Sequence, residues 1–207
     1  MVACRRALAG VGRTVNRRSA VAESASADDV LEHVRSNGHL VVPLANGEPP
    51  ALLDAIERAA ERGDIDHVTV HQMHALRDRP YLHGQYGDRL RHVSYFLSHV
   101  TRPCFQAGTV DLVPNHFSEV FDHIRHRAND PLVIAAASPP DAHGYFSLGV
   151  SADYTSSFIG RARFFLEVNE HMPRTFGRNQ IHISQIEGWY RANRELVEVA
   201  QIGRAHV

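Results

Sequence analysis

The chain has 207 residues, enough to bury one substantial core, and its 43% hydrophobic and 22% charged residues are ordinary for a globular protein. The formal net charge of −1 gives no reason to expect nucleic acid or a membrane surface as a partner. Cys4 and Cys104 are too few for a disulfide framework or a four-thiolate metal site, and no apolar run of about 18 residues predicts a spanning helix. We therefore expect a reduced, cytoplasmic protein.

The first 22 residues carry five arginines and no acidic residue. This composition is typical of an organellar transit peptide, which would place the protein in mitochondria, and it also fits an overextended bacterial gene start. All 22 basic residues of the chain are arginine, which indicates a GC-rich genome and favours the bacterial interpretation. We expect residues 1–25 to form a disordered extension.

Regular patterning begins at Ser26, which can cap a short helix over residues 28–34, and residues 40–44 then form a first strand. Pro49 and Pro50 open an amphipathic helix that ends at Gly63. Further strands are expected at residues 67–70, 93–96, 110–113, 131–137 and 164–168. Further helices are expected at residues 101–107, 116–127 and 154–163, and around Leu196 and Val197.

Strands that alternate with helices predict an α/β fold with an open, mainly parallel sheet and flanking helices. Residues 131–137 are continuously apolar, as expected of a strand that is covered on both faces. No repeat, low-complexity linker or composition break interrupts the pattern, so we expect a single domain over residues 26–201.

Residues 138–149 follow the most apolar strand and carry the densest set of polar and aromatic side chains. Ligands of open parallel sheets bind outside the carboxyl ends of the strands, so this loop is a candidate site. The alternative is a rigid turn in which Asp141 and His143 cap backbone groups. A serine-hydrolase elbow is disfavoured, because the segment from Gly144 to Gly149 has one residue too many for the G-x-S-x-G turn.

Other sites are poorly supported by the residues. His67, His71 and His74 have helical spacing for a metal site, but the strand predicted at residues 67–70 breaks that geometry, so we expect no metal. The chain has no lysine, which rules out a P-loop, and no G-x-G-x-x-G follows a strand. Neither a nucleotide-hydrolysing P-loop enzyme nor a Rossmann dehydrogenase is expected.

Three segments, taken in order, resemble a known family: residues 46–49, residues 138–149, and residues 168–177 followed by 181–184. Over residues 26–200 the chain is similar to the N-terminal domain of the acetyl-CoA hydrolase/transferase family, and most of all to the 4-hydroxybutyrate CoA-transferases. The resemblance implies an α/β CoA-transferase domain. It also implies a CoA thioester as a substrate, with no permanently bound cofactor, and a short carboxylic acid as the other substrate.

The family's catalytic nucleophile is a glutamate that lies in its C-terminal domain, beyond residue 207. No glutamate of this chain is therefore expected to act as the nucleophile, including Glu48, Glu119 and Glu187. The resemblance further implies that the complete protein forms a homo-oligomer and that this chain alone is inactive.

By the same resemblance, two segments face the missing domain and line the acyl pocket. They contribute the substrate-binding candidates Asn46, Gly47, Glu48, Pro49, Pro139, Asp141, His143, Gly144, Tyr145 and Phe146. Asp141 and His143 would offer polar contacts, and Tyr145 and Phe146 an apolar wall. Residues 172–175 would form either a second loop of the site or a structural brace.

The chain departs from the family pattern at Leu44, where the 4-hydroxybutyrate enzymes tend to have histidine, and at Arg178 and Asn179, where Asp-Ser is usual. The first departure leaves the acid open between 4-hydroxybutyrate, acetate and other short acids. Two alternatives to a CoA-transferase remain: an acetyl-CoA hydrolase, and a non-catalytic module that binds an acyl-CoA or a nucleotide. Residues 202–207 match the translation of a sequencing adapter, so we expect a non-native tail.

Overall fold

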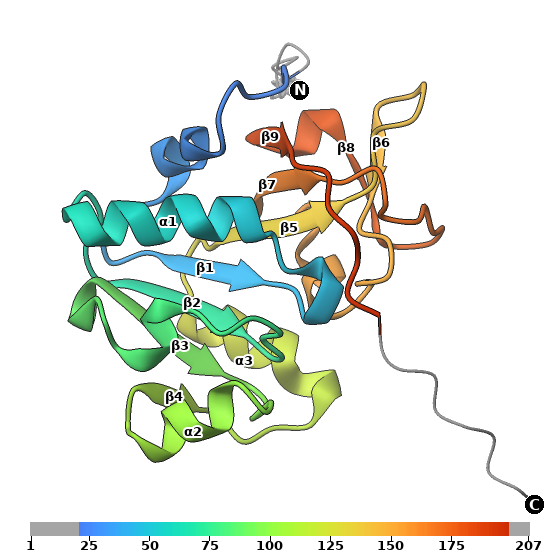
Figure 1. Cartoon of the computed structure of the whole chain (residues 1–207). Helices are drawn as coiled ribbons and strands as arrows, with labels where there is room; N and C mark the ends of the chain where they lie inside the picture. Colours follow the sequence, from blue (N-terminus) through green and yellow to red (C-terminus); the bar gives the residue numbers. More distant parts are fainter. Residues whose placement is uncertain (1–20, 199–207) are drawn as a thin grey trace, which may run out of the picture.

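A seven-stranded parallel sheet runs through the centre of the protein in the computed structural model, which describes residues 21–198 (Figure 1). The strands are arranged in the order β4-β3-β2-β1-β5-β7-β9. Their bounds are β1 His39–Val42, β2 Val68–Gln72, β3 Leu90–Ser94, β4 Val110–Leu112, β5 Leu132–Ala137, β7 Arg163–Val168 and β9 Gly188–Arg191. Every neighbouring pair in this sheet is parallel, which confirms the predicted open α/β fold.

Helices cover both faces of the sheet because the strands alternate between two hydrophobic clusters. On β5, Leu132 and Ile134 belong to one cluster and Val133 and Ala135 to the other. The first cluster packs under α1 (Pro50–Arg62), the short α2 (Thr101–Gln106) and the 3-10 helix η1 (Ala27–His33). The second cluster packs under α3 (Val120–Arg127) and the 3-10 helix η6 (Tyr154–Phe158). This two-sided cover explains the continuous apolar run of β5.

Helix α1 begins and ends as the sequence predicts. Pro50 occupies its first turn, and Gly63 follows its last residue with a left-handed φ of 80°. Leu52 and Ile56 lie fully buried against the sheet. Because α1 follows the end of β1 after residues 43–49, its amino end lies at the edge of the sheet where the parallel strands end (Figure 1).

Short elements account for most differences from the sequence prediction. A second sheet, antiparallel, pairs β6 (Tyr145–Ser147) with β8 (Gln180–His182), and neither strand was predicted. The helix predicted at residues 154–163 is only the 3-10 turn η6, after which β7 begins. The remaining 3-10 turns are η2 Ala45–Gly47, η3 Pro80–His83, η4 Gly87–Arg89, η5 Phe117–Glu119 and η7 Ile183–Gln185.

The prediction of a helix around Leu196 and Val197 is wrong. Residues 192–198 form an extended segment without helix, which the amide and carbonyl of the Asn46 side chain hold through the backbone of Val197. Part of the expected N-terminal extension is described: Glu23 forms an isolated bridge with Trp189 of β9. Residues 1–20 and the expected tail at 202–207 lie outside the described residues. Over residues 21–198, no helix has the length and apolar character that crossing a membrane requires.

Candidate functional site at the carboxyl edge of the sheet

The two predicted site segments lie at the same edge of the sheet. Strands β1 and β5 are direct neighbours, with Leu40 opposite Leu132, so the turn after β1 and the loop after β5 both leave the carboxyl edge. The chain that continues from the loop returns to this turn, where the Ser151 hydroxyl donates to the carbonyl of Leu44 at 3.3 Å. The structure thus confirms the predicted position of residues 138–149 at a strand's carboxyl end.

Asp141 organises the turn inside this loop. Its Oδ1 accepts hydrogen bonds from the backbone amides of His143 and Tyr145, each at 2.9 Å, and its Oδ2 accepts one from Arg174 at 2.8 Å. The Tyr145 amide above all, then the His143 amide and the Arg174 charge, hold the pKa of Asp141 below its usual value. This is the rigid-turn alternative, in which the carboxylate binds the protein's own backbone.

Residues 172–175 act as a brace for the same loop. The Arg174 guanidinium donates to the carbonyls of Pro139 at 3.1 Å and Tyr145 at 2.8 Å. The Ser147 hydroxyl donates to the Thr175 carbonyl at 2.9 Å and accepts from the Thr175 amide at 3.1 Å. Of the two roles expected for this segment, the bracing one is what these contacts show.

Only part of the predicted apolar wall reaches the surface. Tyr145 is 41% exposed and meets the edge of the His182 ring at 4.8 Å between centroids, and His143 is exposed beside it. Phe146 is fully buried and packs edge-on against Trp189, so it supports the loop from beneath. Gly144, at φ 81°, adopts the left-handed turn conformation that favours glycine.

The turn after β1 is tied into the protein by each of its predicted residues. Asn46 bonds to the backbone of Val197, and a Cβ added at Gly47 would lie 2.5 Å from the Ser151 side chain. Pro49 is the residue from which α1 starts. These contacts give the turn a structural role, and whether its residues also touch a substrate stays a prediction.

Glu48 is buried and already bound. Its carboxylate accepts hydrogen bonds from Gln72 at 3.0 Å and from Arg79 at 3.4 Å, and only 3% of the residue is exposed. Arg79 also pairs with Asp54 at 2.8 Å and with Glu57 at 2.9 Å. Glu48 therefore belongs to a cluster that attaches the segment after β2 to helix α1.

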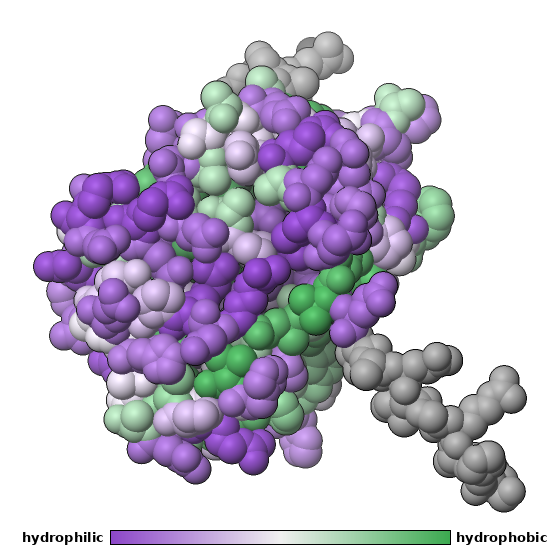
Figure 2. Space-filling model, in the orientation of Figure 1, coloured by the Kyte–Doolittle hydropathy of each residue, from purple (hydrophilic) through white to green (hydrophobic). Residues whose placement is uncertain are grey.

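An apolar groove lies beside the turn after β1. Its wall comes from the ends of three neighbouring strands and from η5, and its residues are Leu44, Ala45, Met73, His74, Phe96 and Phe117. The space along this wall is about 540 Å³, part of it open to solvent, so the groove is a depression in the surface and not an enclosed cavity. Figure 2 shows an apolar stripe between hydrophilic surfaces that reaches the side of the molecule where the strands end.

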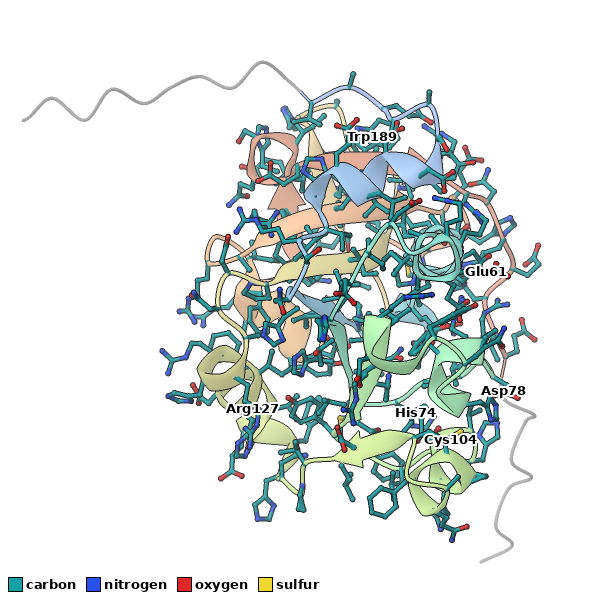
Figure 3. All side chains as sticks on the ribbon, turned by 90° about the vertical axis from the view of Figure 1, so that its left-hand side faces the viewer. Glu61, His74, Asp78, Cys104, Arg127 and Trp189 are labelled. Atoms are coloured by element: carbon teal, nitrogen blue, oxygen red, sulfur yellow. The ribbon has the colours of Figure 1, made fainter. Side chains whose placement is uncertain are left out.

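Large aromatic side chains stand exposed in this groove. Phe96 is 47% exposed and Phe117 is 52% exposed, and the ring of His74 stacks on Phe96 at 5.7 Å with a 12° interplanar angle. Burial, and then the nearby His99, lower the pKa of His74, while the Glu48 charge opposes the shift. In Figure 3, His74 lies toward the α2 end of the sheet, opposite Trp189. Exposed apolar clusters of this kind mark sites that a ligand or partner covers.

The sequence analysis named two residues of this groove, Leu44 as a departure from a family pattern and His74 as part of a disfavoured metal site. A usable signal existed, because Met73 and His74 directly follow β2 and Phe96 closely follows β3. The same strand-end rule that singled out residues 138–149 also applies to these positions. The helix expected at residues 116–127 begins only at Val120, and Phe117 lies in the short turn η5 before it. Within residues 21–198, no three histidine, cysteine or acidic side chains gather as a metal site.

The sequence is similar to curated CoA-transferases. It is 34% identical to succinyl-CoA:cyclohexane-1-carboxylate CoA transferase of Geobacter metallireducens over 74% of this chain and 35% of that protein. It is 29% identical to 4-hydroxybutyrate coenzyme A transferase of Clostridium kluyveri over 84% of this chain and 41% of that protein. The chain thus spans about two fifths or less of the length of these relatives.

Solved structures agree with this similarity. RipA from Yersinia pestis superimposes with a TM-score of 0.79 at 31% identity, over 88% of this chain and 44% of that chain. A 4-hydroxybutyrate CoA-transferase from Porphyromonas gingivalis gives a TM-score of 0.63 at 27% identity, over 84% of this chain and 40% of that one. Residues 12–201 match the acetyl-CoA hydrolase/transferase N-terminal domain. The chain therefore belongs to the acetyl-CoA hydrolase/transferase family, as the motifs at residues 46–49, 138–149, 168–177 and 181–184 predicted.

Proposed function

We propose that this chain is the N-terminal part of a CoA-transferase that moves CoA between a short-chain acyl-CoA and a carboxylic acid. The observation that carries the proposal is the family match, which extends over residues 12–201. The CoA-transferase names of the relatives from Geobacter metallireducens and Clostridium kluyveri support transfer to a carboxylic acid. The exposed apolar groove at the carboxyl edge supports a site for the acyl part of the substrate.

In the proposed reaction, a glutamate of a second domain attacks the carbonyl carbon of the acyl-CoA thioester. The CoA thiolate leaves, and an acyl-glutamyl anhydride forms. The thiolate then attacks the glutamyl carbonyl, which releases the acyl group as a carboxylate and leaves a glutamyl-CoA thioester. The acceptor acid reverses these steps and leaves with CoA. Covalent catalysis of this kind divides one difficult exchange into easier steps.

This chain contributes binding and positioning in that scheme. The hydrogen bonds from Gln72 and Arg79 to the buried carboxylate of Glu48 make it a poor nucleophile. We propose that the braced loop at residues 139–149 and the turn at residues 46–49 face the second domain across the groove. We also propose that the complete protein is a cytoplasmic homo-oligomer.

The experiment uses the chain together with the residues that follow it in the source genome. The complete protein is mixed with butyryl-CoA and acetate, and acetyl-CoA is followed by chromatography. We expect acetyl-CoA to form only when acetate is present, and the 207-residue chain alone to give none. Absence of acetyl-CoA from the complete protein, or transfer by the chain alone, would contradict the proposal.

Hydrolysis is the second candidate, because the matched family includes acetyl-CoA hydrolases. In a hydrolase, water takes the place of the acceptor acid, and free CoA thiol accumulates without any added acid. A thiol assay without acetate separates the two reactions. Acetate-independent release of CoA at the rate seen with acetate would favour the hydrolase.

A further inference from the structure

The groove beside the turn after β1 has a wall of uniform chemistry. Leu44, Met73, Phe96 and Phe117 offer only apolar atoms, and no charged side chain is among the lining residues. His74 is its polar side chain, and its ring lies nearly parallel to the Phe96 ring. A ligand in this groove therefore exchanges water for apolar contacts, which is favourable for hydrocarbon and costly for polar groups.

The polar groups around the groove already bind the protein itself. The Asp153 carboxylate accepts hydrogen bonds from the Leu44 amide at 2.9 Å and from the amide and hydroxyl of Thr155. The Tyr154 hydroxyl donates to the Val42 carbonyl and accepts from the Met73 amide. Both hold the ends of β1 and β2 in place.

Other polar side chains at this edge are equally unavailable. The side chain of Asn46 is held by the backbone of Val197, and the Glu48 carboxylate is held by Gln72 and Arg79. Two amide oxygens without a protein partner, on Gln72 and Asn115, are shielded from solvent. Among the residues that line the groove, His74 is the one with a polar side chain, and His99 is exposed near it.

We propose that this groove holds the acyl chain and selects unsubstituted aliphatic or alicyclic monocarboxylic acids over hydroxylated or dicarboxylic ones. The inference rests on the proposed function, because it assigns a substrate class to the same site. A hydroxyl or carboxylate on the acyl chain would lose its hydrogen bonds to water, and the apolar side chains of this wall would not replace them. The groove is open to solvent, so a ring can lie against its apolar wall as well as a short chain.

The expected discrimination follows from this loss of partners. An apolar pocket rejects an analogue that merely adds a hydroxyl by at most about 100-fold, so we expect about 10- to 100-fold between butyrate and 4-hydroxybutyrate. A second carboxylate costs more to desolvate than a hydroxyl. We therefore expect succinate to be used at least about 100-fold less well than butyrate, measured as kcat/KM.

The test measures kcat/KM of the complete protein for five acceptor acids, with acetyl-CoA as the common donor. Butyrate, hexanoate and cyclohexanecarboxylate should be preferred over 4-hydroxybutyrate and succinate by the factors above. Equal or better use of 4-hydroxybutyrate or succinate would overturn the inference while leaving the proposed function intact. If the complete protein transfers CoA to none of the five acids, that result contradicts the proposed function, and the inference with it.

Variants connect the preference to the groove. Phe117→His and Leu44→His each place a hydrogen-bonding ring on the wall, and we expect the butyrate to 4-hydroxybutyrate ratio to fall at least about 5-fold. Phe105→His is the matched control, because Phe105 is also exposed, at 40%, but lies on α2 outside the groove. If Leu44→His does not fold, Phe117→His decides, since Phe117 is 52% exposed. An unchanged ratio in the folded groove variants would contradict the proposal.

Discussion

Glu167 is a fully buried carboxylate in an apolar strand, and its partners explain why it is tolerated. Its Oε2 accepts hydrogen bonds from the amides of Ala51 at 2.7 Å and Leu52 at 3.3 Å, which are unpaired donors in the first turn of α1. Arg194 donates to its Oε1 at 3.2 Å. Burial raises the pKa of Glu167 although Arg194 opposes the shift. The residue joins β7, α1 and the segment after β9 at the edge that carries the groove.

We expect Glu167→Gln to lower the free energy of unfolding by about 1.5–3 kcal/mol, because hydrogen bonds to a charged group are lost in a buried place. Urea denaturation followed by circular dichroism measures the change. Glu61→Gln is the control, since Glu61 is exposed on α1 (Figure 3) and its replacement should cost less than about 0.5 kcal/mol. Equal stability of the two variants would show that Glu167 does not cap the helix.

Sequence reasoning could not have found this role for Glu167. The partners lie 115 and 116 residues away in the chain, and the strand pattern around the residue gives no sign of which face it occupies. Asp141 was different, because a residue that binds amides two and four positions ahead is a local pattern that turns commonly show. Local chemistry was therefore predictable, and contacts between distant strands and helices were not.

At the scale of elements, the longest patterns gave the most accurate predictions. Helix α1 has proline at its start, glycine after its end and an apolar stripe between them, and β5 is an uninterrupted apolar run. Strands β6, β8 and β9 have only three or four residues each, and each depends on a partner strand distant in the chain. A periodicity test needs a longer window, so these strands were not predicted, and a helix was wrongly predicted around Leu196 and Val197.

The loop that follows β6 depends on a glycine at one position. Gly149 has a φ of 62°, and a Cβ there would lie 2.3 Å from the Met172 sulfur and 2.9 Å from the Pro173 carbonyl oxygen. Gly149→Ala therefore combines backbone strain with a collision against the bracing segment, and we expect it to cost more than about 3 kcal/mol. Thermal unfolding monitored by circular dichroism measures the loss.

Gly160→Ala is the matched comparison. Gly160 also has a positive φ, of 76°, but a Cβ there would approach only the Gln185 side chain, at 3.9 Å. Its replacement should cost about 1–2 kcal/mol from the backbone conformation alone. If the two alanine variants unfold at the same temperature, residues 172–175 do not pack against the loop as described.

At the scale of the whole molecule, two buried histidines make stability depend on pH. Burial lowers the pKa of both His71 and His92 to about 3, and neither ring nitrogen of His92 has a hydrogen-bond partner within residues 21–198. The unfolded chain binds protons at these residues near pH 6.5, while the folded chain does not. Each histidine therefore lowers the free energy of unfolding as the pH falls from about 6.5 toward 3, by up to about 1.4 kcal/mol per pH unit.

Asp153 changes the free energy of unfolding with pH in the opposite direction to the two histidines. Burial raises its pKa to about 6, so the folded chain binds this proton first, and stability is gained as the pH falls from about 6 toward 4. A variant that removes one histidine separates these contributions, because Asp153 is present in both proteins.

We compare the free energy of unfolding of His92→Leu with that of the wild-type chain at two pH values. We expect the difference to shift in favour of the variant by about 2 kcal/mol between pH 7.5 and pH 5, because the variant lacks one buried group that resists protonation. Urea denaturation at the two pH values measures the difference. His126→Leu is the control, since it makes the same replacement at an exposed position. Parallel stability curves for wild type and His92→Leu would contradict the buried, neutral state of His92.

We propose that this domain presents the acyl site in the groove at the carboxyl edge of its parallel sheet. A crystal structure of the complete protein with bound butyryl-CoA tests this placement most directly. We expect acyl carbons within about 4.5 Å of the side chains of Leu44, Met73 and Phe96. An acyl chain that lies away from this groove, for example against the outer face of residues 139–149 alone, would contradict it.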